Sequence, residues 1–318
     1  MKARSGGAAL ITAMLTLSLV ASLAAVALGR QWRNIEIESA ENARAQALWV
    51  LTGALDWARL ILREDGRSGG ADYLAEPWAI PLEEARITTF LAADKTTSAE
   101  DLMDQVFLSG RISDLQARLN VYNLVDGTRV SDPDLKAFAK LFQLLGLPQA
   151  ELTALADNLR YARDTRGEAG PDALVPLLPQ RLDQLTWLGL SPASLARLRP
   201  FVTLLPVRTP VNVNTASAQV LYACIEPLDL AQAQRLVGVR QLSHFNSLAD
   251  VSKVIGELAG KLDESHHSVN SRFFEVSGRL RQEQTVVEER SVVQRDGMNV
   301  TVLWREHGTP AAPAPSLQ

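Results

Sequence analysis

The amino-terminal segment constrains the fold of this chain more than any other stretch of its 318 residues. Lys2 and Arg4 are followed by a charge-free segment, 5–29, which contains the apolar run Ala8–Leu28. In a helix that rises about 1.5 Å per residue, this run is about 32 Å long, which is enough for one bilayer crossing. Because the basic residues precede the run, we expect a single-pass inner-membrane protein with a cytoplasmic amino terminus and its bulk in the periplasm.

The helical pattern does not stop where the apolar run ends. No proline occurs between Ala8 and Glu64, and Gly66 stands where a carboxyl-terminal helix cap is expected. We therefore predict one continuous helix over 8–65, about 85 Å long, which is apolar all round at first and then amphipathic. Beyond the run, apolar residues recur at mostly three- and four-residue steps: Ile35, Ile37, Ala40, Ala43, Ala47, Val50, Leu51, Ala54, Leu55, Ala58 and Leu62.

Three interpretations of the amino terminus are open. A cleaved secretory signal would use Ala25–Ala27 as its small-x-small site and release a periplasmic enzyme. A plain signal anchor would hold a periplasmic binding module at the inner membrane. A third kind of leader is cut on the cytoplasmic side, after a glycine and before the apolar run, where Gly6 and Gly7 stand. The long amphipathic continuation favours this third interpretation, since a cleaved secretory signal has no need of it.

The remainder of the chain changes its pattern twice. Strand-like alternation after the long helix gives way to short amphipathic helices, and alternation returns after His267. A β region on each side of an α block is most simply an α+β domain into which an all-α domain is inserted. The predicted segments are a leader (1–7), the long helix (8–65, transmembrane over 8–28), a first α+β part (66–130), the inserted all-α domain (131–267), a second part of antiparallel strands (268–307) and a disordered tail (308–318).

Turn residues place the expected strands more closely. Ser109-Gly110 is expected to separate two strands within 105–125, and Asp126-Gly127 marks the next turn. Asp296-Gly297 predicts a hairpin near the end of the chain. A short helical turn is expected over 98–103. The predicted architecture is therefore a long amino-terminal helix packed on a small antiparallel sheet.

Composition argues against nucleic acid as a partner. Lys and Arg number 32 against 36 Asp and Glu, so the net charge is −4 and no basic domain stands out. Val211–Asp250 resembles a helix-hairpin-helix module. Its turn at 225–229, however, lacks the glycine that lets a phosphate approach a backbone N–H.

The motifs of common catalytic and metal sites are also missing from the sequence. The single cysteine, Cys224, excludes an internal disulfide and thiolate metal sites built by this chain alone. His266 and His267 are adjacent, so their side chains point to different sides in any regular element. There is no Gly-x-Ser-x-Gly and no phosphate loop. We predict that the chain is not an enzyme, with no catalytic residues and no cofactor.

Four short motifs occur in an order that resembles one family. They are Gly7–Ile11 at the leader junction, Asp72–Trp78, Asp114–Asn120 followed by Asn123-Leu124-Val125, and Thr209–Ala216. Together with the long helix and the inserted helices, they resemble the K-type minor pseudopilins (general secretion pathway protein K) of type II secretion systems, which are relatives of type IV pilins. The resemblance runs from residue 1 to about residue 305.

The resemblance implies that prepilin peptidase cuts the precursor between Gly7 and Ala8 and that the new amino terminus is methylated. Cleavage after Gly6 is an open alternative. Counted from Ala8, the fifth mature position is Thr12, where most pilins carry glutamate and K-type subunits usually do not. A carboxylate inside the membrane is costly unless a partner neutralises it, and a subunit at a filament tip has no subunit ahead of it.

The resemblance also implies a role and partners. The role is that of a minor pseudopilin at the pseudopilus tip, which initiates assembly and caps the filament for protein export across the outer membrane. The partners are the I-type and J-type minor pseudopilins, followed by the H-type and major pseudopilins. We predict that partners bind one face of the amphipathic helix, formed by Val50, Leu51, Ala54, Leu55 and Ala58.

Calcium is the one metal that the resemblance raises, because pseudopilins often bind it through carboxylates and carbonyls. The family commonly has an acid-rich Trp-x-Asp-x-Asp stretch in its helical domain. The corresponding part of this chain, Leu155–Arg166, holds Asp157 and Asp164 without such a cluster. The ligands of a calcium ion are therefore not placed from the sequence.

Overall fold

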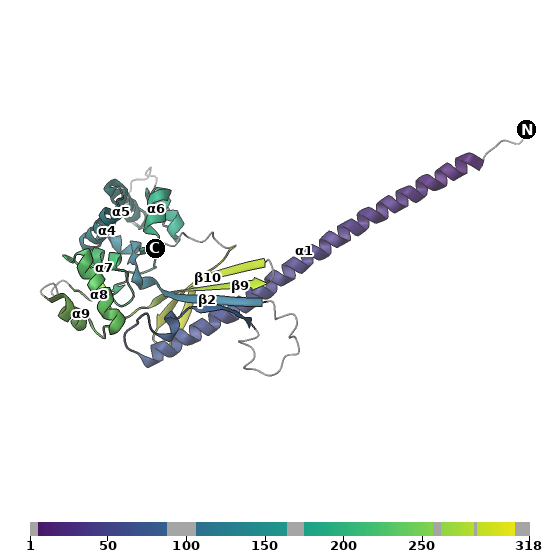
Figure 1. The fold of residues 1–318 in the computed structure, drawn as a ribbon. Coiled ribbons are helices and arrows are strands. Elements are labelled where there is room, and N and C mark those ends of the chain that lie inside the picture. Colours follow the sequence, from purple (N-terminus) through teal and green to yellow (C-terminus); the bar gives the residue numbers. More distant parts are fainter. Residues whose placement is uncertain (1–5, 88–105, 164–174, 257–261, 283–284, 309–318) are drawn as a thin grey trace, which may run out of the picture. The chain divides into compact units, whose positions relative to one another are not determined.

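A computed structural model describes residues 6–87, 106–163, 175–256, 262–282 and 285–308. The chain forms two compact units, residues 1–53 and 54–318. One helix, α1 (Gly6–Ser68), accounts for the first 63 described residues, so the predicted continuous helix is confirmed (Figure 1).

The carboxyl-terminal end of α1 lies beyond the predicted end at residue 65. The N–H of Gly69 bonds the carbonyl oxygen of Asp65 at 3.1 Å, and Gly69 has a φ of +66°. Gly69, rather than Gly66, therefore ends the helix in the left-handed conformation that favours glycine. Gly66 is needed for a different reason, since a Cβ atom there would collide with the carbonyl oxygen of Gly297.

The membrane-length part of α1 has an exposed surface. The side chains of 9–42, apart from Gly29, are exposed. Among the described residues, α1 is the one helix that is long and apolar enough to cross a membrane. An exposed apolar surface of this length is typical of a segment that lipid or partner subunits cover.

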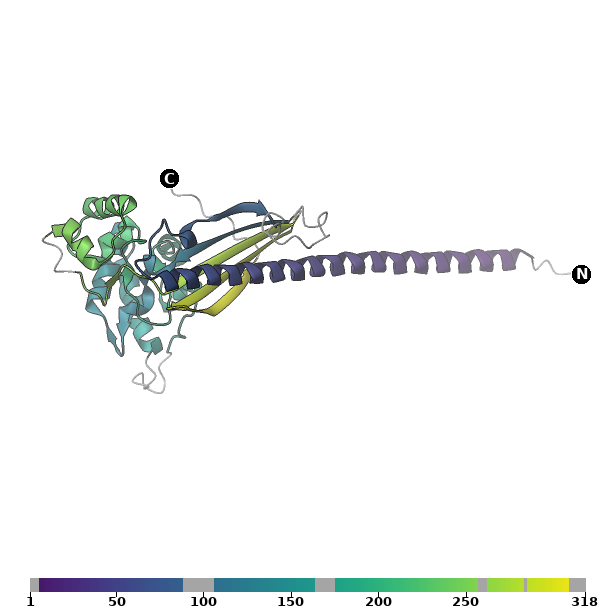
Figure 2. The same ribbon diagram turned by 90° about the horizontal axis from the view of Figure 1, so that it is seen from below.

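Residues 54–318 contain a five-stranded antiparallel sheet in the order β1-β2-β9-β10-β11. Residues 54–68 of α1 lie against one face of this sheet (Figure 2). Leu55, Ala58 and Leu62 of α1 form an apolar core there with Trp78, Ile112, Phe274, Val276, Val293 and Val300. The strands are β1 (Leu82–Arg86), β2 (Val106–Asp114), β9 (Phe273–Gln282), β10 (Thr285–Asp296) and β11 (Asn299–Gly308), and Pro77–Ala79 forms the short helix η1.

The chain leaves this sheet after Asp114 and returns to it at Phe273. Because β2 and β9 are neighbours, with Asp114 paired to Phe274, the two ends of the intervening segment lie side by side. This segment, 115–272, is called the insert below. Its helices are η2 (Leu115–Ala117), η3 (Val121–Leu124), α4 (Asp132–Leu144), α5 (Gln149–Arg163), η4 (Leu182–Leu188), α6 (Pro192–Leu198), α7 (Ala218–Cys224), α8 (Leu230–Leu242) and α9 (Leu248–Ile255).

Short strand pairs supplement the helices of the insert. β3 (Leu119–Asn120) pairs in parallel with β6 (Val202–Thr203), and β7 (Val211–Asn212) pairs in parallel with β8 (His267–Ser268). The hairpin of β4 (Val125–Asp126) and β5 (Arg129–Val130) turns at Gly127, and the hairpin of β10 and β11 turns at Gly297. Both glycines have a positive φ, which confirms the predicted turns.

Two sequence predictions in this part need correction. The predicted pair of strands over 105–125 is wrong, because β2 runs straight through Ser109-Gly110. The strand ends at Asp114, whose side chain accepts the N–H of Gln116, and Asn120 binds the N–H of Tyr122 in the same way. Such local side-chain bonds turn the chain away from a strand.

The insert consequently begins earlier than the predicted residue 131. Leu119, Val121, Tyr122, Leu124 and Val125 are buried in the same apolar core as the helices that follow. The predictions for 98–103 and for the tail beyond 308 lie outside the described residues.

Candidate functional site: the long helix and the polar joint

The predicted partner face of α1 is largely covered by the chain itself. Leu51, Leu55 and Ala58 are buried, whereas Val50 and Ala54 are half-buried. Leu55 and Ala58 pack on the sheet. Part of the predicted partner face therefore covers the chain's own sheet, and partner binding by the less buried residues Val50 and Ala54 stays a prediction.

The apolar residues that stay accessible on α1 lie elsewhere on the helix. Trp57 is 52% exposed and Leu60 is 49% exposed, and Trp49, two turns before Trp57, is 77% exposed. Gly53, between the tryptophans, has open space above it. At about 3.6 residues per turn, these four residues share one side of the helix. These four residues lie outside the periodic aliphatic stripe, so the apolar spacing did not indicate them as an accessible surface.

A buried carboxylate ends strand β2. Asp114 is 5% exposed and accepts hydrogen bonds from four neutral donors. Its Oδ1 accepts the backbone N–H of Gln116 at 2.7 Å. Its Oδ2 accepts the side chains of Asn212, Thr215 and Ser271 at 3.1, 2.5 and 2.6 Å. Burial raises the pKa of Asp114, and the four hydrogen bonds oppose that rise.

Asn212 connects this carboxylate to two further segments. It is completely buried, and its Nδ2 lies 2.9 Å from the Oγ of Ser271 and 3.1 Å from the carbonyl oxygen of Asp72. Its Oδ1 accepts the N–H of Asn214 at 2.9 Å, so the side chain also stabilises a local turn. The side chain thus joins positions that are 59 to 140 residues away in the sequence.

A charged pair extends the network to α1. Asp72 is 3% exposed and accepts the N–H of Ser271 and the Nη2 of Arg295, both at 2.6 Å. Arg295 also pairs with Asp65 in α1 and donates to the carbonyl oxygen of Ser271. Burial raises the pKa of Asp72 to about 6, against the opposing effect of Arg295. We call the following residues the polar joint: Asp65, Asp72, Asp114, Asn212, Thr215, Ser271 and Arg295.

Three of the four motifs recognised in the sequence meet at the polar joint. Asp72–Trp78, Asp114–Asn120 and Thr209–Ala216 each contribute at least one of its residues. The Thr215 hydroxyl binds Asp114, and Ser217 caps α7. Nothing within each motif indicates which distant segment its polar side chain contacts.

An acidic group adjoins the polar joint. Ligand atoms of Asp65, Asp72 and Glu76 lie within 4.8 Å of one another. The Glu76 carboxylate accepts the N–H of Tyr73 and the Nε1 of Trp78, both at 2.8 Å, and burial raises its pKa to about 7. The Arg295 guanidinium already pairs with Asp65 and Asp72. These residues therefore do not fit a calcium ion, because a cation occupies the position between the carboxylates.

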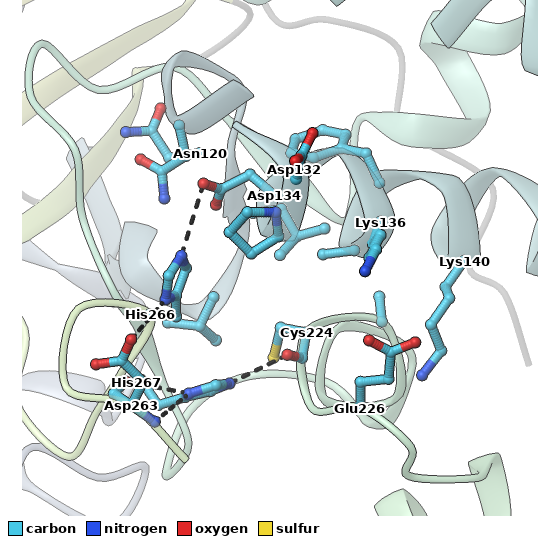
Figure 3. A pocket seen from close by; sticks show the side chains of 17 residues that line it. Asn120, Asp132, Asp134, Lys136, Lys140, Cys224, Glu226, Asp263, His266 and His267 are labelled. Atoms are coloured by element: carbon cyan, nitrogen blue, oxygen red, sulfur yellow. Dashed lines mark hydrogen bonds and ion pairs between the residues drawn. The ribbon is translucent and has the colours of Figure 1, made fainter. Parts of the chain in front are cut away.

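A pocket of about 380 Å³ opens beside α4 in the insert (Figure 3). His266 lies in its wall, with Nδ1 at 3.3 Å from a carboxylate oxygen of Asp263 and Nε2 at 3.7 Å from one of Asp134. His267 is turned toward the carbonyl oxygen of Cys224, at 3.2 Å from Nε2. The two rings, 6.4 Å apart, do not converge on one point, in agreement with the sequence prediction.

Cys224 and His267, two titratable residues of this wall, are poorly suited to nucleophilic catalysis. Burial raises the pKa of the Cys224 thiol to about 12, so the sulfur stays protonated. Burial also lowers the pKa of His267, so its imidazole stays neutral at physiological pH. Neither group offers an activated nucleophile.

Comparison with known proteins places the chain in a family. Two family models match it, both described as type II secretion system protein K, one over residues 117–207 and the other over 211–270. The type II secretion system protein K of Pseudomonas aeruginosa is 30% identical, in an alignment that covers 99% of this chain and 97% of that protein. The chain belongs to the type II secretion system protein K family. The protein K of Pectobacterium carotovorum is 26% identical, over 97% of this chain and 98% of its own length.

A solved structure supports the fold of this K-family chain. A chain in the crystal structure of the GspK-GspI-GspJ complex from the enterotoxigenic Escherichia coli type 2 secretion system matches with a TM-score of 0.64 and 18% identity. The match covers 85% of this chain and 99% of that chain, and it shows the α+β pilin-like fold. The two matched ranges, 117–207 and 211–270, both fall inside the insert. The family signature and the insert are therefore the same part of the molecule.

The amino-terminal positions of this K-family chain all lie in α1. Gly7 and Ala8 are in its first turns, and Thr12 is exposed, with its hydroxyl donating to the carbonyl oxygen of Ala9 at 3.0 Å. The Thr12 hydroxyl is satisfied within the helix, which is compatible with an apolar environment. Cleavage between Gly7 and Ala8 stays a prediction.

Proposed function

We propose that this K-family chain is the tip subunit of a type II secretion pseudopilus, where it initiates assembly with I-type and J-type minor pseudopilins and caps the filament during export. One observation carries the proposal: the insert is attached at the carboxyl-terminal end of α1. Asp65 in α1 pairs with Arg295, which donates to Ser271 at the end of the insert. In a filament whose subunit helices run parallel out of the membrane, an insert attached at this end of α1 supports a capping role.

The partner surface in this proposal is the exposed side of α1. Trp57 and Leu60 present apolar area to solvent, and tryptophan is enriched among residues that dominate binding energy. Gly53 lets another helix backbone approach closely, because no side chain stands above it. The similar structure is a GspK-GspI-GspJ complex, which supports I-type and J-type proteins as the occupants.

Binding measurements test this surface. We expect the double variant Trp57→Ser/Leu60→Ser to weaken the affinity for the I-type and J-type partners by at least about tenfold, which corresponds to about 1.4 kcal/mol. Arg63→Ser, at an exposed and polar position of the same helix, is the matched control and should bind as the unmodified chain does. Equal affinities of the unmodified chain, the double variant and the control for the partners would place the contact elsewhere.

The proposal includes maturation by prepilin peptidase at the inner membrane. The uncharged run after Gly7 is the substrate feature, and α1 supplies the span. Intact-mass analysis after co-expression with the peptidase should show a loss of residues 1–7 and a methylated Ala8. A mature form that begins at Leu28 would instead show a cleaved secretory signal.

A further inference from the structure

The insert and the sheet have separate apolar cores. The core of the insert and the core between α1 and the sheet share no residue. Between them lies a small apolar cluster, in which Leu115 and Leu205 of the insert meet Phe273 and Val292 of the sheet. Apolar contacts lack direction, so this small cluster leaves the angle between the two parts weakly determined.

The polar joint supplies the direction that the apolar cluster lacks. Hydrogen bonds need short distances and near-linear angles, so a buried set of them fixes relative orientation. Asp114 belongs to the last residue pair of the sheet before the insert, and its Oδ2 accepts bonds from Asn212, Thr215 and Ser271 of the insert. The donors come from positions 98, 101 and 157 residues away in the sequence.

The chemistry of Asp114 explains why a carboxylate stands there. Two carboxylate oxygens accept all four donors together, whereas an amide would turn its NH2 group toward either the N–H of Gln116 or the NH2 group of Asn212. Burying an ion is costly, and Asp114 has no cationic partner within its hydrogen-bond set. Asp72, by contrast, is paired with Arg295. The buried carboxylate therefore lowers the stability of the folded chain somewhat, but it makes four hydrogen bonds of fixed direction.

We propose that Asp114 is the positioning residue that fixes the orientation of the insert on the sheet, so that the polar joint acts as a rigid connection between α1 and the insert. This inference goes beyond the proposed function, because it concerns the geometry of the chain by itself. Its consequence for capping, that a loosened insert caps poorly, rests on the proposed function.

Distances between spin labels on the full chain in detergent micelles test the rigid connection. One label replaces Gln234 on α8 and the other replaces Thr301 on β11, both at exposed positions, in a Cys224→Ser background. We expect one narrow distance distribution for the unmodified joint, and at least a doubling of its width in Asp114→Ala. Thr215→Val, which removes one donor and keeps the shape of the side chain, should give an intermediate width.

A matched control separates positioning from stability. Asn120 is as buried as the joint residues, but its hydrogen bonds all stay inside the insert, to Tyr122, Leu205, Val207 and Thr209. Asn120→Ala should lower stability and leave the distribution narrow. Where Asp114→Ala does not fold, Thr215→Val decides.

Three results would overturn the inference: a broad distribution in the unmodified chain, an unchanged width in folded Asp114→Ala, or equal broadening in Asn120→Ala. Secretion by cells that carry Asp114→Ala separates the two proposals. Broadened distances with normal secretion would leave the rigid connection standing and remove the capping role.

Discussion

The core of the insert and the polar joint hold the molecule together in different ways. The core gathers about thirty buried apolar residues, from Leu119 to Val251, around α4, α5 and α7. The joint uses a few buried polar and charged side chains, from Asp65 to Arg295. Apolar burial gives large, direction-free stability, whereas hydrogen bonds give little net stability and much direction. Stability and orientation therefore have separate structural origins in this chain.

Truncation of a side chain in the core of the insert should produce the largest change in the free energy of unfolding. Phe142 in α4 is completely buried, and Phe142→Ala should lower the free energy of unfolding by about 3–5 kcal/mol. Chemical unfolding of the full chain in detergent micelles measures the loss. The label distance between insert and sheet should keep its width, and a broadened distance would break the contrast between core and joint.

Removal of the Asp114 carboxylate should lower the free energy of unfolding less than Phe142→Ala does, but it should broaden the distance between insert and sheet more. Asp114→Ala leaves the donors of Gln116, Asn212, Thr215 and Ser271 without their acceptor. We expect a net loss of about 1–3 kcal/mol in the free energy of unfolding, because the removed cost of burying the carboxylate offsets most of the cost of the unsatisfied donors. A loss larger than that of Phe142→Ala would show that the joint, and not only the apolar core of the insert, is a main source of stability.

The acidic side of the joint predicts a pH dependence. The pKa of Glu76 is raised from 4.5 to about 7 in the folded chain, so the folded state keeps a proton that the unfolded state has released between these values. Stability due to this group should therefore fall as pH rises through that window. Asp72, raised to about 6, acts in the same direction at lower pH.

Glu76→Gln isolates the first of these groups. The variant should unfold at a higher denaturant concentration than the unmodified chain at pH 8, with little difference at pH 4.5. Its amide oxygen can still accept the bonds from Tyr73 and Trp78. A variant whose denaturant midpoint keeps the full pH dependence of the unmodified chain would assign that dependence to other groups.

The exposed side of α1 should show the smallest effect on stability. Trp57→Ser/Leu60→Ser changes residues that are about half exposed, so the free energy of unfolding should shift by no more than about 0.5 kcal/mol for each. The same unfolding measurement checks this value. A small shift together with the loss of partner binding would identify a surface kept for association.

Regular features of this fold were predictable because their signals are local. Charge-free length, absence of proline and apolar spacing predicted α1, and the Asp-Gly pairs predicted both hairpin turns. The change from strand to helix patterning and back predicted an insertion, although not its start at Leu115. There the side-chain bonds of Asp114 and Asn120 override the strand pattern.

The site could not be predicted to the same degree. Apolar spacing identified the face of α1 that is buried, but it could not show that the chain's own sheet covers it. The side-chain partners of Asp72 and Asp114 lie about 100 to 220 residues away in the sequence, so no local window contains the joint. Of the joint residues, four belong to separate sequence motifs: Asp72, Asp114, Asn212 and Thr215.

Replacement of the insert tests the central claim, that the insert sets the place of this subunit at the tip, most directly. A short Gly/Ser linker in place of residues 117–268 keeps the contacts of Gln116 with Arg272 and of Asp72 with Val269 and Ser271. The shortened chain should fold and bind the I-type and J-type partners through α1, while pseudopilus length and secretion change. A shortened chain that binds its partners and supports pseudopili of normal length and normal secretion would contradict the account.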